Sequence, residues 1–379
     1  MSQKHYDYII VGNGLAGLQL ALAFAKDSYF NHKSIALIDA SSKTENDKTW
    51  SFWEQEDRSF SHLAYQTWQH ATIFAEGKKI NLNLKPYTYK SIRAIDFYTE
   101  AKAQLNQQDN ITFLVETVTS VNEKDIVEIT TETNNYTANH VFDSRIPDAF
   151  FKDKKAITLI QHFKGWIIET EDNVFNENSF TMMDYRLKDN NQTAFMYVLP
   201  HTKNKALVEF TYFTENTVKS DHYDTYLKQY ISEYLNINNY NIVETEIGQI
   251  PMTTFNFGAF NTSKVTKIGT GGGWVKGSTG YSFKLTERKV AKIIENIKSN
   301  QPTTEGLFKS KYKFYDKVFL QVLKDNNEKG EWIFKQFYSK NNTPTMFKFL
   351  DEESSLLEDI KIMWSLFSFS FIKAFFKTL

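Results

Sequence analysis

The sequence predicts an α/β fold with a Rossmann-like dinucleotide-binding domain, an inserted antiparallel β-sheet domain and a helical C-terminal region. Three observations support this fold class. The chain opens with a buried strand, a glycine turn and an apolar helix. Short β-like runs dominate residues 156–215. Residues from about 283 to the end have mostly helical patterning.

The first 39 residues have the pattern of a βαβ unit. An apolar run at 6–11 leads into Gly12-Asn13-Gly14-Leu15-Ala16-Gly17. A helical pattern then continues to about Lys26, and a second apolar run at 34–39 follows. The glycines therefore stand between a predicted strand and a predicted helix, which is the context that makes G-x-G-x-x-G informative.

Each glycine of this motif has a separate physical task. Gly12 permits the tight turn, Gly14 lets a pyrophosphate approach the backbone, and Gly17 allows close packing of helix and strand. The helix N-terminus favours the phosphate charge. Asp39 ends the second strand, where a carboxylate can accept hydrogen bonds from ribose hydroxyls. The predicted cofactor contacts here are Gly12, Gly14, Leu15, Ala16, Gly17 and Asp39.

A second glycine cluster spans Gly269–Gly280, after the predicted strand VTKIG. It is not a P-loop, because Gly277 separates Lys276 from Ser278. A late strand, glycine turn and helix bring backbone N–H groups to the flavin side of FAD in two-dinucleotide-domain flavoproteins. This cluster therefore favours FAD over NAD as the ligand. The expected contacts of this cluster with FAD are Gly271, Gly272 and Gly280. Arg145, which ends the segment Asp143-Ser144-Arg145, is a further expected contact, although its side chain could instead hold its own loop together.

The predicted domains are interleaved along the chain. Residues 1–60, 90–160 and 262–300 form a discontinuous FAD-binding domain, because the strand runs at 141–145 and 265–269 return to it. The substrate-binding sheet domain takes residues 61–89 and 161–261, and residues 301–379 are helical.

Composition excludes several classes of function. The chain of 379 residues has no cysteine, so it has no disulfide, no thiolate metal site and no cysteine nucleophile. This suits a reducing cytoplasm, and we expect no secretory signal before the first strand. The formal net charge is −1, so the chain has no long-range positive electrostatic field that would attract nucleic acid. No metal-binding histidine spacing and no G-x-S-x-G elbow occurs, so we predict no metal.

Several segments together resemble one known family. They are VGNGLAGLQLA at Val11, NDKTWSFWE at Asn46, VFDSR at Val141, FTMMDYR at Phe180, FMYVLP at Phe195, ALVEFTYFT at Ala206, GQIPMT at Gly248 and GGGWVKGSTGYSF at Gly271. In order and spacing they resemble the bacterial flavoprotein lycopene cyclases of carotenoid biosynthesis, over roughly residues 6–290. The cluster reads GTGGGWVKGSTGY, where more distant relatives often have His-Pro before Thr-Gly-Tyr.

The resemblance implies a lycopene β-cyclase, an intramolecular lyase of the isomerase class. Such an enzyme protonates an acyclic ψ end of lycopene, closes the ring and releases a ring proton, giving the β-ionone rings of γ-carotene and β-carotene. It implies FAD without net redox change, reduced when active, with NAD(P)H as an indirect reductant. Other carotenoid-pathway enzymes are then expected partners.

The resemblance also implies an acid. Glu209 matches the family's catalytic glutamate, and an apolar pocket would raise its pKa, although a strand glutamate can also face solvent. Asp184 and Arg186 lie two residues apart on one strand face, where they can orient a carboxylate, contact the cofactor or form a structural ion pair. The expected substrate-pocket residues are Trp50, Trp53 and Tyr185, with ordinary core packing as the alternative.

The C-terminal segment 359–379 is rich in aromatic and aliphatic residues. Only eleven uncharged residues separate Lys361 from Lys373, which is too short to span a bilayer. We therefore predict an interfacial helix on a membrane surface, with docking on the protein core as the alternative. The expected location is cytoplasmic, peripherally attached to the inner membrane.

Two other functions fit the first βαβ unit. An FAD-dependent monooxygenase or isoprenoid reductase usually has Gly-Asp where this chain has Gly269-Thr270. A non-catalytic prenyl-lipid carrier would not need the intact glycine motif and Asp39. The sequence leaves open β, γ or ε ring type and one-ended or two-ended cyclisation.

Overall fold

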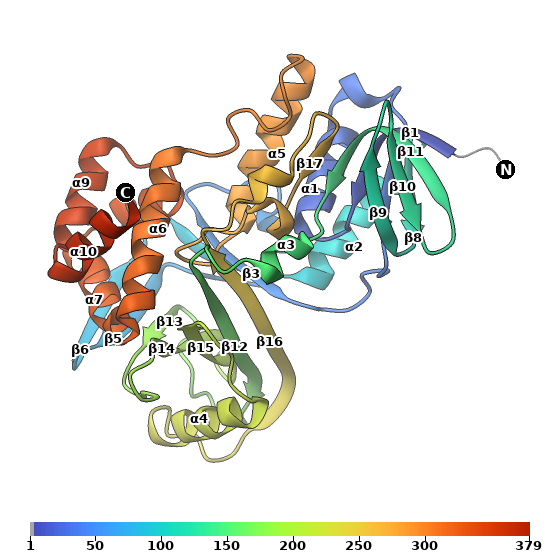
Figure 1. The fold of residues 1–379 in the computed structure, drawn as a ribbon. Helices are drawn as coiled ribbons and strands as arrows, with labels where there is room; N and C mark the ends of the chain where they lie inside the picture. The colour runs from blue at the N-terminus through green and yellow to red at the C-terminus, as the bar shows by residue number, and fades with distance from the viewer. Residues whose placement is uncertain (1–3) are drawn as a thin grey trace.

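The computed structural model describes residues 4–379 and contains three β-sheets with helices on their faces (Figure 1). The first sheet has the order β8-β2-β1-β11-β10-β9, with β17 beside β11. Its parallel strands are β1 (Lys4–Val11), β2 (Ile35–Asp39), β8 (Ile111–Val115), β11 (Asn135–Asp143) and β17 (Val265–Lys267). The antiparallel strands β9 (Val118–Glu123) and β10 (Val127–Thr131) extend it.

Helices α1 (Leu15–Lys26), α2 (Ala94–Leu105) and α5 (Phe283–Lys298) pack together beside this sheet. Their apolar faces share one core with the inner strands, through side chains such as Leu18, Phe97 and Ile293. A short helix, α3 (Asp148–Lys152), follows β11. The opposite face carries a second core, made by side chains of the strands themselves such as Ile9, Ile38 and Val141.

The second sheet also has seven strands, in the order β16-β12-β15-β14-β13-β5-β6. They are β5 (His70–Ala75), β6 (Lys78–Asn83), β12 (Thr158–Glu169), β13 (Ser179–Asp184), β14 (Ala194–Thr202), β15 (Lys205–Thr214) and β16 (Asn241–Thr253). All neighbours are antiparallel except the parallel pair of β13 and β5. Helix α4 (Ser220–Glu233) covers one face, where Val208 and Phe210 point (Figure 1).

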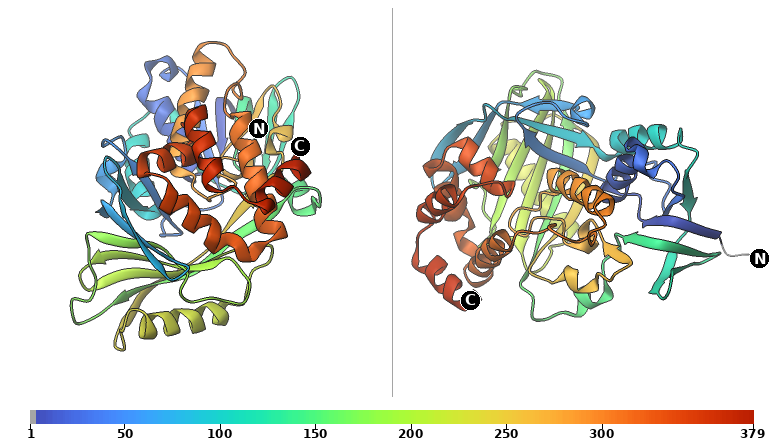
Figure 2. Two further views of the ribbon diagram at one scale, coloured as in Figure 1. Left: turned by 90° about the vertical axis from the view of Figure 1, so that its left-hand side faces the viewer. Right: turned by 90° about the horizontal axis from the view of Figure 1, so that it is seen from above.

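A third, small sheet has the order β3-β7-β4 and lies between these two parts. Its strands are β3 (Thr49–Glu54), β4 (Gln66–Trp68) and β7 (Thr88–Arg93). The C-terminal helices gather on the side of the large antiparallel sheet away from α4 (Figure 2). They are α6 (Ser310–Asp325), α7 (Gly330–Lys340), α8 (Thr343–Leu350), α9 (Leu356–Ser365) and α10 (Phe369–Thr378). Five 3₁₀ turns complete the description: Ser28–Phe30, Ser61–Leu63, Phe257–Phe260, Thr270–Gly272 and Asn327–Lys329.

This arrangement confirms the predicted α/β fold class, with two local differences. The run at 111–121 forms two strands rather than one, because β8 pairs with β2 while β9 pairs with β10 at the other edge. The segment 359–379 forms two helices rather than one. Ser365 donates a hydrogen bond back to the Ile362 carbonyl as α9 ends, and Ser368 precedes α10.

Candidate functional site

The carboxyl ends of four parallel strands meet at one edge of the first sheet. β1, β2, β11 and β17 end there, so the loops after Val11, Asp39, Asp143 and Lys267 are neighbours. Ligands of open α/β sheets bind outside this edge. The predicted cofactor residues of both glycine clusters therefore lie on adjoining loops.

Two glycines of the first turn occupy positions that other residues would not fit, and the third leaves the backbone open. Gly12 has a φ of 103°, and a Cβ there would collide with the Ser144 side chain. A Cβ on Gly17 would collide with the Gly12 carbonyl. A Cβ on Gly14, in contrast, would meet no described atom within 4 Å. The backbone is thus open at the position where a pyrophosphate approaches.

The start of α1 is prepared for an anion. Among the described residues no side chain caps this helix, and its first turn, which begins at Leu15 and Ala16, holds no acidic residue. Asp39 accepts hydrogen bonds from the Asn13 N–H at 2.6 Å and the Ser41 N–H at 2.7 Å. The Asn13 Oδ1 atom is buried without a hydrogen-bond partner among residues 4–379. These features fit a dinucleotide whose phosphates lie at the helix N-terminus.

The second glycine loop packs against the loop after β11. A Cβ on Gly271 would collide with the carbonyls of Ser144 and Arg145, and one on Gly272 would collide with the Lys267 carbonyl. The Arg145 guanidinium holds its own loop together. It donates to both oxygens of Asp143 at 2.9 Å and to the Val118 carbonyl at 3.1 Å. Burial opposes the charge of Asp143, but the Arg145 hydrogen bonds and nearby Lys267 outweigh it and lower the Asp143 pKa.

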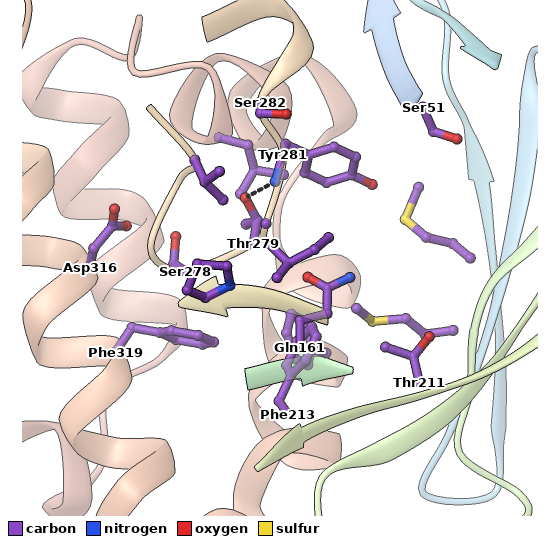
Figure 3. Close-up of a pocket in the computed structure, with 18 of the residues that line it drawn as sticks. Ser51, Gln161, Thr211, Phe213, Ser278, Thr279, Tyr281, Ser282, Asp316 and Phe319 are labelled. Carbon is purple, nitrogen blue, oxygen red and sulfur yellow. Dashed lines mark hydrogen bonds between the residues drawn. The ribbon is translucent and has the colours of Figure 1, made fainter. Parts of the chain in front are cut away.

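A cavity of about 1070 Å³ extends from these loops along the large sheet to the C-terminal helices. Figure 3 shows its walls: Gln161, Thr211 and Phe213 come from the sheet, and Asp316 and Phe319 come from α6. Ser278, Thr279, Tyr281 and Ser282 come from the end of the second glycine cluster and the two residues that follow it. Gly280 lines it too, with a φ of 75°. Most of the lining is aromatic or aliphatic, which suits a large apolar ligand.

Three tyrosines form a hydrogen-bonded group in the cavity wall. The Tyr89 hydroxyl is 2.9 Å from the Tyr197 hydroxyl and 3.0 Å from the Tyr281 hydroxyl. Tyr197 also donates to Ser51 Oγ at 3.4 Å. Since their hydroxyls satisfy one another, the three rings can present apolar surface to the cavity without an unpaired polar atom.

Glu209 lies on β15 in the cavity wall and is 8% exposed. Thr211 Oγ1 donates a hydrogen bond to its Oε1 atom at 2.6 Å. Burial raises the pKa of Glu209 to about 8, the negative charge of Glu246 adds to the rise, and the Thr211 hydrogen bond offsets part of it. The Glu209 side chain therefore holds a proton at neutral pH, which is the state of a general acid.

The Asp184–Arg186 pair links β13 to α4. Arg186 donates to Asp184 at 2.5 Å, and Tyr230 on α4 donates to the same carboxylate at 2.7 Å. The guanidinium also lies over the Phe74 ring, 4.0 Å from its centroid. The structural ion pair is therefore the arrangement that the structure shows for these residues. Tyr185 is buried among apolar side chains of the core.

The two tryptophans lie in different surroundings. Trp50 lines the cavity and packs edge-on against Phe97, with ring centroids 5.6 Å apart. Trp53 is 3% exposed, stacks on Phe347 and donates to Asp351 at 2.7 Å, so it joins β3 to α8. Trp50 is thus placed to contact a ligand, while Trp53 supports the cavity wall.

The sequence reasoning did not single out Glu246 or the tyrosine group. Glu246 lies on β16, two residues before the GQIPMT segment, and lines the cavity. Strand alternation could have indicated Glu246 as a site residue, since Glu246, Gly248 and Ile250 share one face of the strand. The structure of residues 4–379 holds no cluster of three metal-binding side chains. No helix in that range is long and apolar enough to cross a bilayer.

Solved structures with the same fold are flavoproteins of several activities. A geranylgeranyl bacteriochlorophyll reductase-like protein from Thermoplasma acidophilum is 13% identical, with a TM-score of 0.63, over 100% of both chains. A flavin-dependent brominase is 12% identical, with a TM-score of 0.60, over 96% of this chain and 93% of that chain. A flavoprotein/dehydrogenase from Cytophaga hutchinsonii is 10% identical, with a TM-score of 0.62, over 95% of this chain and 100% of that chain.

Family-level comparison is more specific than the fold. No curated protein sequence matches this chain. A family model described as lycopene cyclase protein matches residues 7–375, which is nearly the whole chain. The match includes both glycine clusters and the C-terminal helices up to Phe375 in α10, and thus all of the cavity lining except Phe376. The chain therefore belongs to the lycopene cyclase protein family.

Proposed function

We propose that this protein is a lycopene β-cyclase that uses FAD without net redox change. The observation that carries the proposal is Glu209, a carboxyl group that keeps its proton in an apolar cavity. This cavity reaches the edge of the first sheet where the two glycine clusters lie. A polyene has no polar group that the protein could bind by hydrogen bonds. Its cyclisation therefore needs an acid and an apolar cavity whose shape positions the chain. Both are present, and the family match supports the same reaction.

The reaction begins with proton transfer from Glu209 to the terminal double bond of an acyclic ψ end. The tertiary carbocation is attacked by a nearby double bond of the same chain, which closes the six-membered ring. Aromatic faces of residues such as Trp50 and Tyr197 stabilise the positive charge. The apolar lining excludes water, which would otherwise capture the cation. Loss of a ring proton completes the isomerisation.

The two glycine clusters and Asp39 suit the edge of the first sheet for binding FAD. Gly14 leaves the pyrophosphate position open, and the loop of Gly271 and Gly272 brings a second backbone turn to the same edge. The cavity reaches this edge at Ser144 and Thr270. When bound, anionic reduced flavin supplies negative charge that stabilises a nearby carbocation.

Membrane docking through the last two helices is part of the proposal. Met363, Phe367, Ile372, Phe375 and Phe376 line the cavity and are also 37–70% exposed. Trp364 and Phe369 extend this apolar surface and are 76% and 79% exposed. An apolar patch of this kind at a cavity opening provides a route for a lipid-dissolved polyene.

Expression in lycopene-accumulating cells tests the proposal. We expect the parent protein to convert lycopene into β-ring carotenoids. We expect Glu209→Gln to leave lycopene unchanged, because the amide of Gln cannot donate a proton to a carbon–carbon double bond. Thr211→Val is a useful companion variant, since it removes only the hydrogen bond to Glu209. Unchanged lycopene with the folded parent protein would contradict the cyclase assignment.

A further inference from the structure

Two carboxyl groups face the cavity from strands on either side of β12. In the register of the sheet, Gly165 on β12 pairs with Glu209 on β15 and with Glu246 on β16. Residues paired across neighbouring strands point to the same face. Glu209 and Glu246 both line the cavity, so they stand in one row with Gly165 between them.

The glycine keeps the space between the carboxyl groups open. A Cβ at Gly165 would lie 2.8 Å from Leu207 Cδ1 and 3.1 Å from Glu209 Cβ. Neighbouring strands are about 4.8 Å apart, so two strand spacings separate the glutamate backbones by about 10 Å. One end of an apolar substrate can therefore contact both carboxyl groups at once.

The two carboxyl groups have different hydrogen-bond partners. Glu246 accepts from the Thr49 N–H at 3.1 Å and from the Thr49 hydroxyl at 3.2 Å. Glu209 accepts only from Thr211 among the described side chains. Hydrogen bonds to a carboxylate favour its ionised form. The pair thus has one member suited to hold a proton and one suited to hold the negative charge.

Other charged and titratable groups surround Glu246. They are Glu209 across Gly165, Glu244 on the same strand, Lys48 before β3 and Tyr65 before β4. Burial raises the pKa of Glu246 and the charge of Glu244 adds to this, while Thr49 and Lys48 act in the opposite direction. Glu244 itself is held by Asn46 at 2.9 Å and Arg93 at 3.3 Å.

We propose that Glu246 is the catalytic base that removes the ring proton, a role that rests on the cyclase function proposed above. Glu209 gives its proton to the CH carbon of the terminal double bond, whose π bond breaks and leaves a cation on the tertiary carbon. The π electrons of a nearby double bond of the chain then form the ring C–C bond and move the cation into the ring. A ring C–H bond then breaks, its electron pair becomes the ring double bond, and Glu246 takes the proton. Glu246 ends protonated and Glu209 ionised, and proton exchange of both groups with solvent between turnovers restores the starting state. The sequence of steps needs no oxidant or reductant.

The test uses the purified, flavin-loaded protein with lycopene in lipid vesicles. We expect Glu246→Gln to lower β-ring formation by about 100-fold. We also expect it to remove the acidic limb of the pH–rate profile and keep the alkaline limb, which belongs to Glu209. Remaining product should shift to other ring isomers, because the proton leaves from another carbon. Glu244→Gln, on the same strand, should keep the parental ring type and an acidic limb, with that limb moved to lower pH because the charge of Glu244 raises the Glu246 pKa.

A second variant covers the case in which the first does not fold. Glu246→Ala removes the carboxylate, and added formate should restore part of its activity by serving as the base. Parental rate, ring type and acidic limb in Glu246→Gln would overturn the role of Glu246 alone. Activity of Glu246→Ala that formate does not raise would also overturn it. No ring formation by the parent would overturn the cyclase function itself.

Discussion

At the scale of single residues, the central feature is a proton kept at neutral pH by desolvation. Glu209 is buried in an apolar wall and faces a second carboxylate, and both effects disfavour its charge. A Glu in water would be ionised and unable to donate. The same burial that creates the acid must therefore cost stability when the group ionises.

This cost predicts a pH dependence of unfolding. Since burial raises the Glu209 pKa to about 8 in the folded state, the folded protein binds more protons than the unfolded chain between pH 4.5 and 8. Stability from this group is fully present below pH 4.5 and falls by about 1.4 kcal/mol per pH unit toward pH 8. Thermal unfolding of parent and Glu209→Gln at pH 5 and pH 8 measures it. The variant should lose less stability over that interval, and equal losses would contradict the burial of an ionisable Glu209.

A second residue-scale prediction concerns the Asp184–Arg186 pair. Asp184 is 0% exposed and is paired by Arg186 and Tyr230, so Arg186→Ala leaves a buried carboxylate without its cation. We expect a loss of about 3 kcal/mol in urea unfolding. Product and pH profile of the folded fraction should stay parental. A stable variant with no turnover would instead assign Arg186 to the chemistry.

At the scale of elements, strand register decides which residues meet. β12 lies between β15 and β16 and brings Glu209 and Glu246 into one row. The sequence alone indicates which residues alternate along each strand, but pairing between strands depends on long-range contacts. For this reason Glu209 was found through its segment, whereas Glu246 was not.

Local patterns predicted other elements well. Helical patterning was expected from about residue 283, and α5 begins at Phe283, because its amphipathic pattern is strong and local. The three-stranded sheet of β3, β7 and β4 was not predicted, since it joins residues from three short runs. Arg145 and Arg186 show a similar limit. The sequence left each of them either a ligand contact or a local role, and in the structure each guanidinium donates to the aspartate two residues before it.

Gly165 gives the element-scale prediction. Gly165→Ala places a methyl group against Leu207 and Glu209, so we expect a loss of about 1–3 kcal/mol in stability. Cyclisation should fall further than stability explains, because the methyl group enters the space between the two carboxyl groups. Gly258→Ala is the control, since its Cβ would approach the side chains of Asn256, at 3.2 Å, and Asn261, at 3.9 Å. Equal turnover of both folded variants would contradict the shared row.

At the scale of the whole molecule, one cavity connects the dinucleotide edge with the exposed apolar surface of α9 and α10. Glu209 lines the cavity between these ends. In the proposed function, a polyene would enter from lipid and reach Glu209 without crossing water. Proteins described as a halogenase and as reductase-like share the fold at low sequence identity. The fold alone therefore does not determine the reaction, which depends on the residues that line the cavity.

Vesicle binding tests this layout. The double variant Trp364→Glu and Phe367→Glu removes two exposed rings from the docking surface, and we expect vesicle binding to fall at least tenfold. Phe151→Glu is the matched control, because Phe151 is 72% exposed on α3, away from the C-terminal helices. Co-sedimentation of each folded protein with anionic vesicles measures the effect. Equal binding by the double variant and the control would exclude α9 and α10 as the docking surface.

The most direct test of the central claim is the mass of the product formed from lycopene in D₂O. Acid-initiated, redox-neutral cyclisation adds one solvent deuteron and releases one carbon-bound proton for each ring. The account therefore predicts carotenoids with one deuterium per ring and no change in hydrogen count. A product with two added hydrogens or an added oxygen would contradict it and would indicate a reductase or a monooxygenase.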